Sequence, residues 1–215
     1  MITDERITEY LHSLDAGEGA FLDELEREAA AACVPIIRRE TAALLKTMVA
    51  VTRPKAILEV GTAVGYSALL MAKVMPSDCR ITTIEKYEKR IPVARENFRL
   101  AGEERIAMLC GDAGEILRKL SGPYELIFMD AAKGQYLGWL PDILRLLAPG
   151  GLLISDNVLQ DGTIVHSRYA VERRERTIHA RMREYLYELT HRDDLQTSVL
   201  PVGDGVALTC KMAGE

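Results

Sequence analysis

The chain has 215 residues, of which 48% are hydrophobic and 27% charged, and its formal net charge is −5. This length predicts a single α/β domain with a well-buried core, and no apolar run reaches the roughly 18 residues of a membrane span. The polar N-terminus does not resemble a signal or transit peptide, and the four scattered cysteines suit reduced thiols, so we expect a cytoplasmic protein. The negative charge argues against a general polyanion binder but allows a local basic patch.

Helical spacing of apolar residues predicts three helices before the first strand, over 4–16, 19–33 and 38–51. Strands are then predicted over 56–60, 80–85, 105–110, 124–129 and 151–155. Helices are predicted between them over 66–75, 87–102, 113–120 and 136–147. A long arginine-bearing helix follows over about 168–190, and strands 195–201 and 205–211 form an antiparallel hairpin around an Asp-Gly turn.

This order of elements predicts a mostly parallel, Rossmann-like sheet with helices on both faces and a ligand site at the carboxyl ends of the strands. We expect one domain, in which residues 1–52 form a helical cap and residues 53–215 form the core.

The stretch 56–71 predicts a buried strand, a glycine turn and the start of a helix. Gly61 allows a tight turn, and Gly65 allows close approach of a ligand or of the helix, because neither residue has a Cβ. Such strand–helix turns are where α/β proteins bind nucleotides. The spacing differs from the dinucleotide fingerprint G-x-G-x-x-G, so a turn without a ligand is the alternative.

Acidic residues stand at the ends of the second, third and fourth strands, at Glu85, Asp112 and Asp130. Glu85 is 24 residues after Gly61, where a carboxylate can accept hydrogen bonds from ribose hydroxyls, and Asp112 can receive an adenine amino group. Each carboxylate can instead be a helix N-cap. Capping alone, however, explains poorly why consecutive strands all end in this way.

Asp130, Asp156 and Asn157 together offer oxygen ligands that suit Mg²⁺ or another divalent cation better than zinc. Lys133 follows Asp130 by three residues and can act as a general base at that site. The alternative for Lys133 is a solvated loop lysine.

Five motifs stand in chain order at 59–67, 83–85, 130–133, 156–158 and 201–205. Together they resemble the cation-dependent O-methyltransferases, a family that includes catechol and caffeoyl-CoA O-methyltransferases. The resemblance covers essentially the whole chain. It implies a class I S-adenosylmethionine (SAM) fold with a seven-stranded sheet that ends in a reversed hairpin, and a SAM-dependent O-methyltransferase activity.

The resemblance also implies roles for single residues. It places these residues at SAM, from the amino-acid end to the adenine: Ile37, Glu59, Gly61, Ser67, Asp130, Glu85, Asp112 and Ala113. It matches Asp130, Asp156 and Asn157 to the metal ligands and Lys133 to the catalytic lysine. Ala131 and Ala132 stand where catechol enzymes carry aromatic or imidazole residues, which leaves room above the metal.

Within the family, the segments 34–36, 61–67, 130–136 and 156–159 are similar to a bacterial tRNA methyltransferase. That enzyme methylates 5-hydroxyuridine at the anticodon wobble position, so the resemblance implies a tRNA anticodon loop as partner and 5-methoxyuridine as product. The alternative is a small hydroxyl-bearing acceptor of the catechol or caffeoyl-CoA type. A non-catalytic SAM-binding or nucleotide-binding module is a third hypothesis, against which the complete metal and lysine set argues.

Arginines cluster after the metal motif and beside the segment that is expected to cover SAM. The candidates for contact with RNA phosphates are Arg38, Arg39, Arg168, Arg173, Arg174, Arg176, Arg181 and Arg183. Glutamates are interleaved with them, so a solvated helix held by ion pairs is the alternative. The apolar residues of the N-terminal helices, like the family resemblance, imply a homodimer. No membrane partner is expected.

Overall fold

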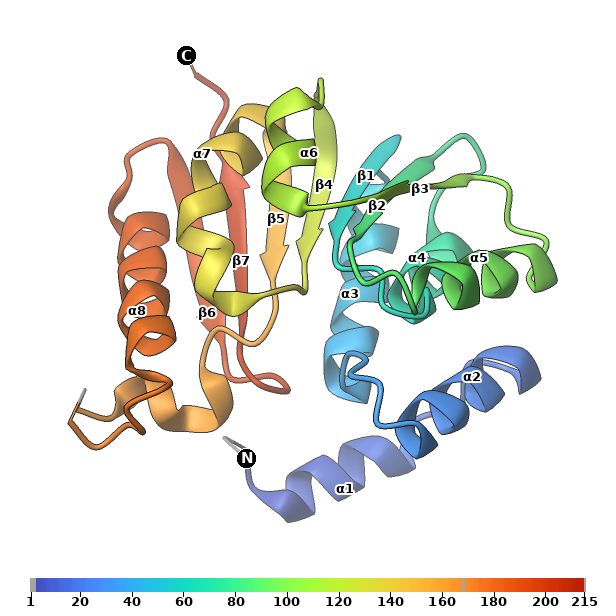
Figure 1. Ribbon diagram of the computed structural model, residues 1–215, viewed down its shortest axis with the longest axis horizontal. Helices are drawn as coiled ribbons and strands as arrows, with labels where there is room; N and C mark the ends of the chain where they lie inside the picture. The colour runs from blue at the N-terminus through green and yellow to red at the C-terminus, as the bar shows by residue number, and fades with distance from the viewer. Residues whose placement is uncertain (1–2, 168, 215) are drawn as a thin grey trace.

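The computed structural model describes residues 3–167 and 169–214, which contain a seven-stranded sheet with helices on both faces (Figure 1). The strands are β1 (Ala56–Val60), β2 (Arg80–Glu85), β3 (Ile106–Cys110), β4 (Tyr124–Met129), β5 (Leu147–Ser155), β6 (Leu195–Leu200) and β7 (Val206–Lys211). Their order is β3-β2-β1-β4-β5-β7-β6, in which β7 runs antiparallel to both neighbours and the other pairs are parallel. The predicted fold class is confirmed.

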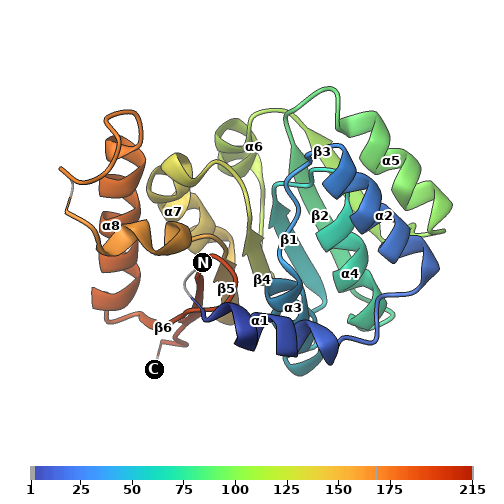
Figure 2. The same ribbon diagram turned by 90° about the horizontal axis from the view of Figure 1, so that it is seen from below.

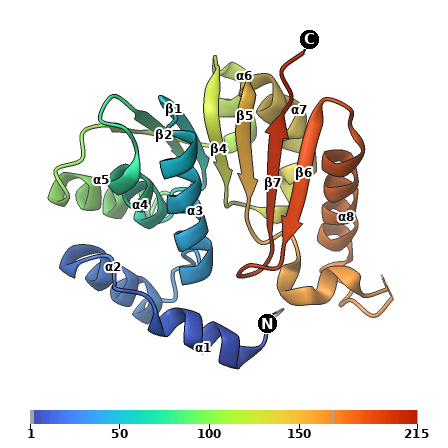
Figure 3. The ribbon, with the colours of Figure 1, turned by 180° about the vertical axis from the view of Figure 1, so that it is seen from behind.

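Helices cover the two faces of the sheet in separate layers. They are α1 (Glu5–Ser13), α2 (Ala20–Ala31), α3 (Arg39–Thr52), α4 (Tyr66–Val74), α5 (Ile91–Leu100), α6 (Ala113–Lys119), α7 (Tyr136–Leu146) and α8 (Arg176–His191), with short 3₁₀ segments η1 (Lys133–Gln135) and η2 (Gln160–Val165). One core layer contains α2 to α5 and the other contains α6 to α8 (Figures 1 and 3). No helix in the described part of the chain is long and apolar enough to cross a membrane.

Strand β4 shows how one sequence run supplies both core layers. Leu126 and Phe128 pack in the layer of α3 and α4, whereas Ile127 and Met129 pack in the layer of α6 to α8. All four side chains are fully buried. Because side chains alternate between the faces of a strand, a strand covered on both sides needs an unbroken apolar run, which is what the sequence has here.

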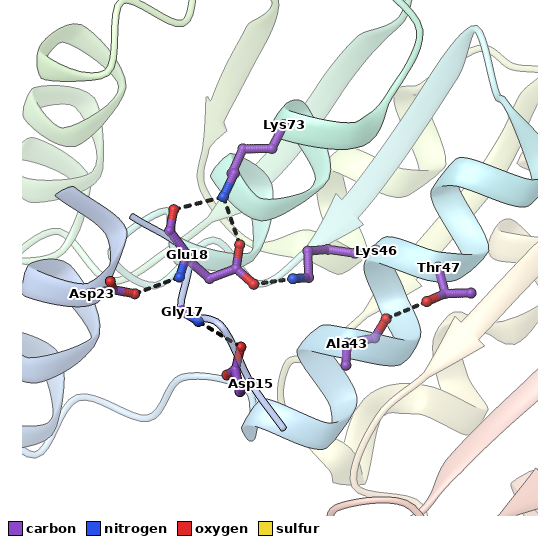
Figure 4. Close-up of polar contacts among 8 residues, drawn as sticks. All are labelled: Asp15, Gly17, Glu18, Asp23, Ala43, Lys46, Thr47 and Lys73. Atoms are coloured by element: carbon purple, nitrogen blue, oxygen red, sulfur yellow. Dashed lines mark hydrogen bonds and ion pairs between the residues drawn. The ribbon is translucent and has the colours of Figure 1, made fainter. Parts of the chain in front are cut away.

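Helix α1 lies outside the two core layers and contributes no buried residue (Figure 2). The loop between α1 and α2 is attached to the core through Glu18, whose side chain is 10% exposed. Its carboxylate pairs with Lys46 of α3 and with Lys73 of α4, and the Lys73 Nζ also donates to the Glu18 carbonyl at 2.7 Å (Figure 4). These pairs hold the pKa of Glu18 below its usual value although burial opposes the shift.

Several predicted boundaries differ from the structure, among them the start of the helix predicted over 87–102, which is Ile91, and two further differences have a clear physical reason. Helix α8 begins at Arg176 rather than near 168, and the Arg176 guanidinium donates to the carbonyl oxygens of Val171 (3.1 Å) and Tyr169 (3.4 Å), which fixes turns ahead of the helix. Strand β5 begins at Leu147 rather than at 151. Leu147 already pairs with Tyr124, and a register shift after this pair accommodates the Pro-Gly-Gly sequence that was interpreted as a turn.

Candidate active site

A cavity of about 740 Å³ opens at the carboxyl ends of β1, β2, β4 and β5. Strand β1 pairs with β2 on one side and with β4 on the other, so the strand order reverses direction beside it. In doubly wound sheets, ligands bind at such a switch point. Most of the predicted site residues line this cavity: Gly61, Glu85, Asp112, Ala113, Asp130, Lys133, Asp156 and Asn157.

The two glycines after β1 are required by their surroundings. Gly61 has φ +107°, and a Cβ there would lie 2.0 Å from the backbone oxygen of Asp130. Gly65 has φ +88°, and a Cβ there would lie 2.5 Å from the Phe98 ring. Any side chain would therefore displace β4 or α5, which explains both glycines without reference to a ligand.

Glu59 and Ser67 lie behind the cavity wall. The fully buried Glu59 carboxylate accepts hydrogen bonds from the Ser67 hydroxyl at 2.6 Å and from the Thr83 hydroxyl at 2.5 Å. Burial raises the pKa of Glu59 to about 7, and the two hydroxyls oppose that shift. Ile37 is likewise buried, at 6% exposed, while its neighbour Ile36 lines the cavity.

The carboxylates at the end of β2 and after β3 accept hydrogen bonds from backbone N–H groups. Glu85 accepts from the N–H groups of Ala63 (2.8 Å), Lys86 (2.9 Å) and Tyr87 (2.7 Å), so it fixes the glycine turn against the end of β2. Asp112 is the N-cap of α6 and accepts from the Gly114 N–H at 2.9 Å. The capping alternative therefore holds for Asp112, which is also exposed at the cavity.

Asp130, Asp156 and Lys133 lie close enough to affect one another electrostatically. Burial raises the pKa of both aspartates, each of which also lies near the carboxylate of Asp204, whereas Lys133 opposes both shifts. Asp130 further raises the pKa of Asp156. Two carboxylates that disfavour each other's charge in a cavity form a site that a cation would stabilise.

Asn157 completes this set in an uncommon conformation, with φ 59°. Its Nδ2 donates to Asp204 Oδ2 at 3.3 Å, which turns the amide oxygen Oδ1 away from that carboxylate. Asp204 also pairs with Arg38 at 2.7 Å, and Arg38 in turn pairs with Asp161 at 3.0 Å. In the sequence, Asp204 was considered only as part of the hairpin turn and of the motif at 201–205, so its place in the cavity was missed.

The donor set fits a hard divalent cation, because it contains two carboxylates and one amide oxygen. The third ligand has to be the Asn157 amide, because among the described residues no group of three or more His, Cys, Asp or Glu side chains could hold a metal ion. Other cavity residues that sequence reasoning did not identify are Tyr87, Arg90, Gln135 and Trp139. The sequence could have indicated these residues only by their position, because each lies shortly after the end of a strand or on the helix that follows that strand.

Most of the arginines predicted to bind RNA contact other parts of the protein. Arg38, Arg39 and Arg174 form ion pairs with carboxylates, and Arg176, Arg181 and Arg183 donate to backbone carbonyl oxygens. Arg38 pairs with Asp161 and Asp204, Arg39 pairs with Glu26, and Arg174 pairs with Glu172 and Glu175. Arg176 donates to the carbonyls of Val171 and Tyr169, Arg181 to that of Gly134, and Arg183 to that of Ile164. Arg173 is exposed, and Arg168 lies outside the described residues.

A family model described as O-methyltransferase matches residues 12–212 of this chain. The chain belongs to the SAM-dependent O-methyltransferase family. It is 36% identical over 126 residues to a catechol O-methyltransferase of Niastella koreensis, and this match covers 56% of the chain and 57% of that relative. The chain thus spans little more than half the length of this relative.

Two solved structures extend the comparison over nearly the whole chain. A candidate caffeoyl-CoA O-methyltransferase of Staphylococcus aureus is 31% identical with a TM-score of 0.89, over 96% of this chain and 100% of that one. A Podospora anserina methyltransferase bound to S-adenosylhomocysteine is 26% identical with a TM-score of 0.87, over 97% of this chain and 95% of that one. Both confirm the family that the motifs indicated.

Proposed function

We propose that this chain transfers the methyl group of SAM to a hydroxyl oxygen of a small phenolic acceptor, with a divalent cation such as Mg²⁺ at Asp130, Asp156 and Asn157. One observation carries the proposal: these three residues and Lys133 line a single cavity together with Glu85 and Asp112. Relatives named for catechol and caffeoyl-CoA support an acceptor of that size. A cavity of about 740 Å³ is also typical for small-molecule sites.

In this proposal, one group of residues binds SAM and Lys133 transfers the proton. We assign Glu85, Asp112 and the Ala113 backbone to the ribose and adenine of SAM, and Gly61 to its amino-acid end; the support for this assignment is that all four line the cavity. Glu59 and Ser67 position that turn from behind, and Ile37 supports the segment that covers it.

Methyl transfer breaks the bond between sulfur and the methyl carbon, forms a bond from the acceptor oxygen to that carbon, and leaves S-adenosylhomocysteine. A bound divalent cation would supply Lewis acidity at the acceptor hydroxyl. In this proposal the hydroxyl proton passes to Nζ of Lys133. Binding of both substrates in one cavity would align the acceptor oxygen with the methyl group, and such alignment supplies much of the rate in reactions of this kind.

A tRNA anticodon loop is the second candidate acceptor. The observation that favours it is the basic segment around exposed Arg173, which follows the cavity in the chain. The intramolecular contacts of the other described arginines weigh against it, because each of those guanidiniums already has a partner. We therefore place the small acceptor first.

A methyl-transfer assay with tritiated SAM and Mg²⁺ tests both candidates. Catechol, caffeoyl-CoA and tRNA from cells lacking wobble hydroxyuridine methylation would be offered separately, each with and without EDTA. We expect label in the phenols, and its loss with EDTA. Label in tRNA alone would contradict the small-acceptor proposal, and undiminished transfer in EDTA would contradict the role of the cation.

A further inference from the structure

A buried hydroxyl lies between the two strand ends that carry the aspartates of the proposed cation site. It belongs to Tyr136, the first residue of α7, whose side chain is 0% exposed. The hydroxyl donates to the Met129 carbonyl oxygen at 3.0 Å and, at the longer distance of 3.4 Å, to the Asp156 carbonyl oxygen. It also accepts from the Ala131 N–H at 3.2 Å. One phenol thus contacts the backbone at the ends of both β4 and β5.

These contacts fix the backbone of both aspartates. Met129 and Ala131 are the two chain neighbours of Asp130. The Met129 carbonyl oxygen also accepts from the Asp156 N–H at 2.9 Å. The neighbours of one aspartate and the backbone of the other therefore meet at a single hydroxyl. Because each side chain starts from its own Cα, this hydroxyl helps to set the distance between the two carboxylates.

The same hydroxyl closes the loop that contains Lys133. The hydrogen bond from the Ala131 N–H joins position 131 to position 136, and Lys133 begins the 3₁₀ segment η1 between them. A closed loop has fewer backbone conformations than an open one. The two aspartates and the lysine of the proposed site consequently share one support.

A support of this kind is needed because two carboxylates repel each other when no cation lies between them. Mg²⁺ requires a nearly regular octahedron of oxygen ligands, so the spacing has to be held by the surrounding structure. The Tyr136 ring is itself held by the Tyr185 ring of α8, which packs against it edge to face with 5.5 Å between the ring centroids. Both rings lie in the core layer of α6 to α8 (Figure 1).

We propose that Tyr136 is a positioning residue for methyl transfer, whose hydroxyl holds Asp130, Asp156 and Lys133 at the spacing that the cation and the acceptor require. This inference rests on the proposed function, because the cation and the proton transfer belong to that function. Tyr136 is fully buried and acts through the backbone of residues that line the cavity.

Tyr136→Phe tests the role, because it removes the hydroxyl and keeps the ring. Binding of Mn²⁺ without substrate is followed by the EPR signal of the free ion, and Mg²⁺ and Ca²⁺ are measured by competition with Mn²⁺. We expect the Kd for Mg²⁺ to rise about tenfold, as is typical when a group that orients metal ligands is removed. The Kd for Ca²⁺ should rise less, because Ca²⁺ accepts longer and less regular coordination. A change in the preference between two cations is not produced by lower stability alone.

Tyr185→Phe is the matched control. Tyr185 is also 0% exposed, and its hydroxyl is hydrogen-bonded to the Ser155 side chain at 2.6 Å rather than to the backbone. Each variant loses buried hydrogen bonding, so urea unfolding should show both to be less stable than the wild type. Only Tyr136→Phe should change the preference for Mg²⁺ over Ca²⁺. Equal cation affinities in the two folded variants would overturn the proposal.

A measurement on the wild type does not depend on the folding of a variant. The amide hydrogen of Ala131 should exchange slowly with solvent, because the Tyr136 hydroxyl accepts its hydrogen bond. Exchange at the rate of an unprotected loop amide would overturn the closure of the Lys133 loop.

The failure of this inference and that of the proposed function give different results. A wild type that binds no Mn²⁺ would overturn the cation site and, with it, both proposals. A wild type that binds Mn²⁺, with the same cation affinities in Tyr136→Phe, would overturn the positioning role alone.

Discussion

Glu59 is a carboxyl group that the fold keeps fully away from water behind the glycine turn. Its two oxygens accept from Ser67 and Thr83, one on the following helix and one on the neighbouring strand. The residue therefore joins β1, β2 and α4 at the point where the turn must keep its shape. Its cost is electrostatic, because the charged form is poorly solvated there.

This cost makes a prediction about pH. The pKa of Glu59 is raised from 4.5 to about 7 on folding, so its contribution to stability is fully present below pH 4.5 and is lost as the pH rises through 7. Each pKa unit corresponds to about 1.4 kcal/mol, so the loss approaches about 3 kcal/mol. Glu59→Gln keeps hydrogen-bonding groups but does not titrate. We expect its free energy of unfolding, relative to the wild type, to be higher at pH 8 than at pH 5, as measured by urea unfolding. Equal differences at both values would contradict the buried charge.

Lys133 carries the proton in the proposed reaction. Removing a general base typically lowers the rate by ~10²–10⁴-fold, so Lys133→Ala should lose most of kcat. Its binding of SAM, measured by calorimetry, should stay close to that of the wild type. Lys119→Ala, at the exposed end of α6, is the matched control and should retain kcat. Unchanged turnover in Lys133→Ala would remove the lysine from the mechanism.

At the scale of elements, the loop between β6 and β7 reaches back to the end of β5. Asp204 in this loop accepts from the Asn157 amide and pairs with Arg38, which lies ahead of α3. A loop, a strand end and a helix start thus meet at one carboxylate. Such a partner keeps the amide oxygen of Asn157 turned toward the proposed cation.

Replacing that carboxylate should therefore weaken cation binding. Asp204→Ala is expected to raise the Kd for Mn²⁺ about 10–100-fold, the usual effect of removing a group that orients a ligand. Arg38→Gln leaves the hydrogen bond to Asn157 in place and should have a smaller effect. Calorimetry without substrate measures both. An unchanged Kd for Mn²⁺ in Asp204→Ala would show that the hydrogen bond from Asn157 to Asp204 does not orient Asn157 for cation binding.

The elements differ in how well the sequence predicts them. The strands of the parallel sheet were predicted because burial on both faces demands apolar runs, as Leu126 to Met129 show. The start of α8 was not, because Arg176 binds carbonyl oxygens of the preceding turns and helical spacing of charged residues does not reveal such contacts. Local sequence patterns therefore predict which residues are buried, but they do not predict which side chains contact the backbone.

The residues of the candidate site also differ in how well the sequence predicts them. Residues directly at strand ends, such as Asp130 and Asp156, were predictable because parallel strands end at one edge of the sheet. Asp204 and Trp139 reach the cavity only through tertiary packing. Glu59 has a recognisable motif position, but its place behind the wall depends on which face of β1 it occupies, and the motif does not report that.

At the scale of the whole molecule, α1 is a nine-residue helix without a buried side chain. Its apolar residues Ile7, Tyr10 and Leu11, together with the C-cap residue Leu14, follow helical spacing and are 46–64% exposed. A short helix gains little stability on its own, and most helices are stabilised by packing of an apolar face. The face of α1 therefore suits a contact with a second copy of the chain, as expected for a homodimer.

The mass of the protein in solution tests whether it is a homodimer. We expect sedimentation velocity to give twice the chain mass of 23.9 kDa for the wild type. The double variant with Tyr10→Glu and Leu14→Glu should shift to the monomer, because each carboxylate would have to be buried in the interface. Tyr187→Glu is the matched control, since Tyr187 is 59% exposed on α8 at the other side of the sheet. Its mass should remain that of the dimer. A wild type that sediments as a monomer at micromolar concentration would show that the α1 face is not a dimer contact.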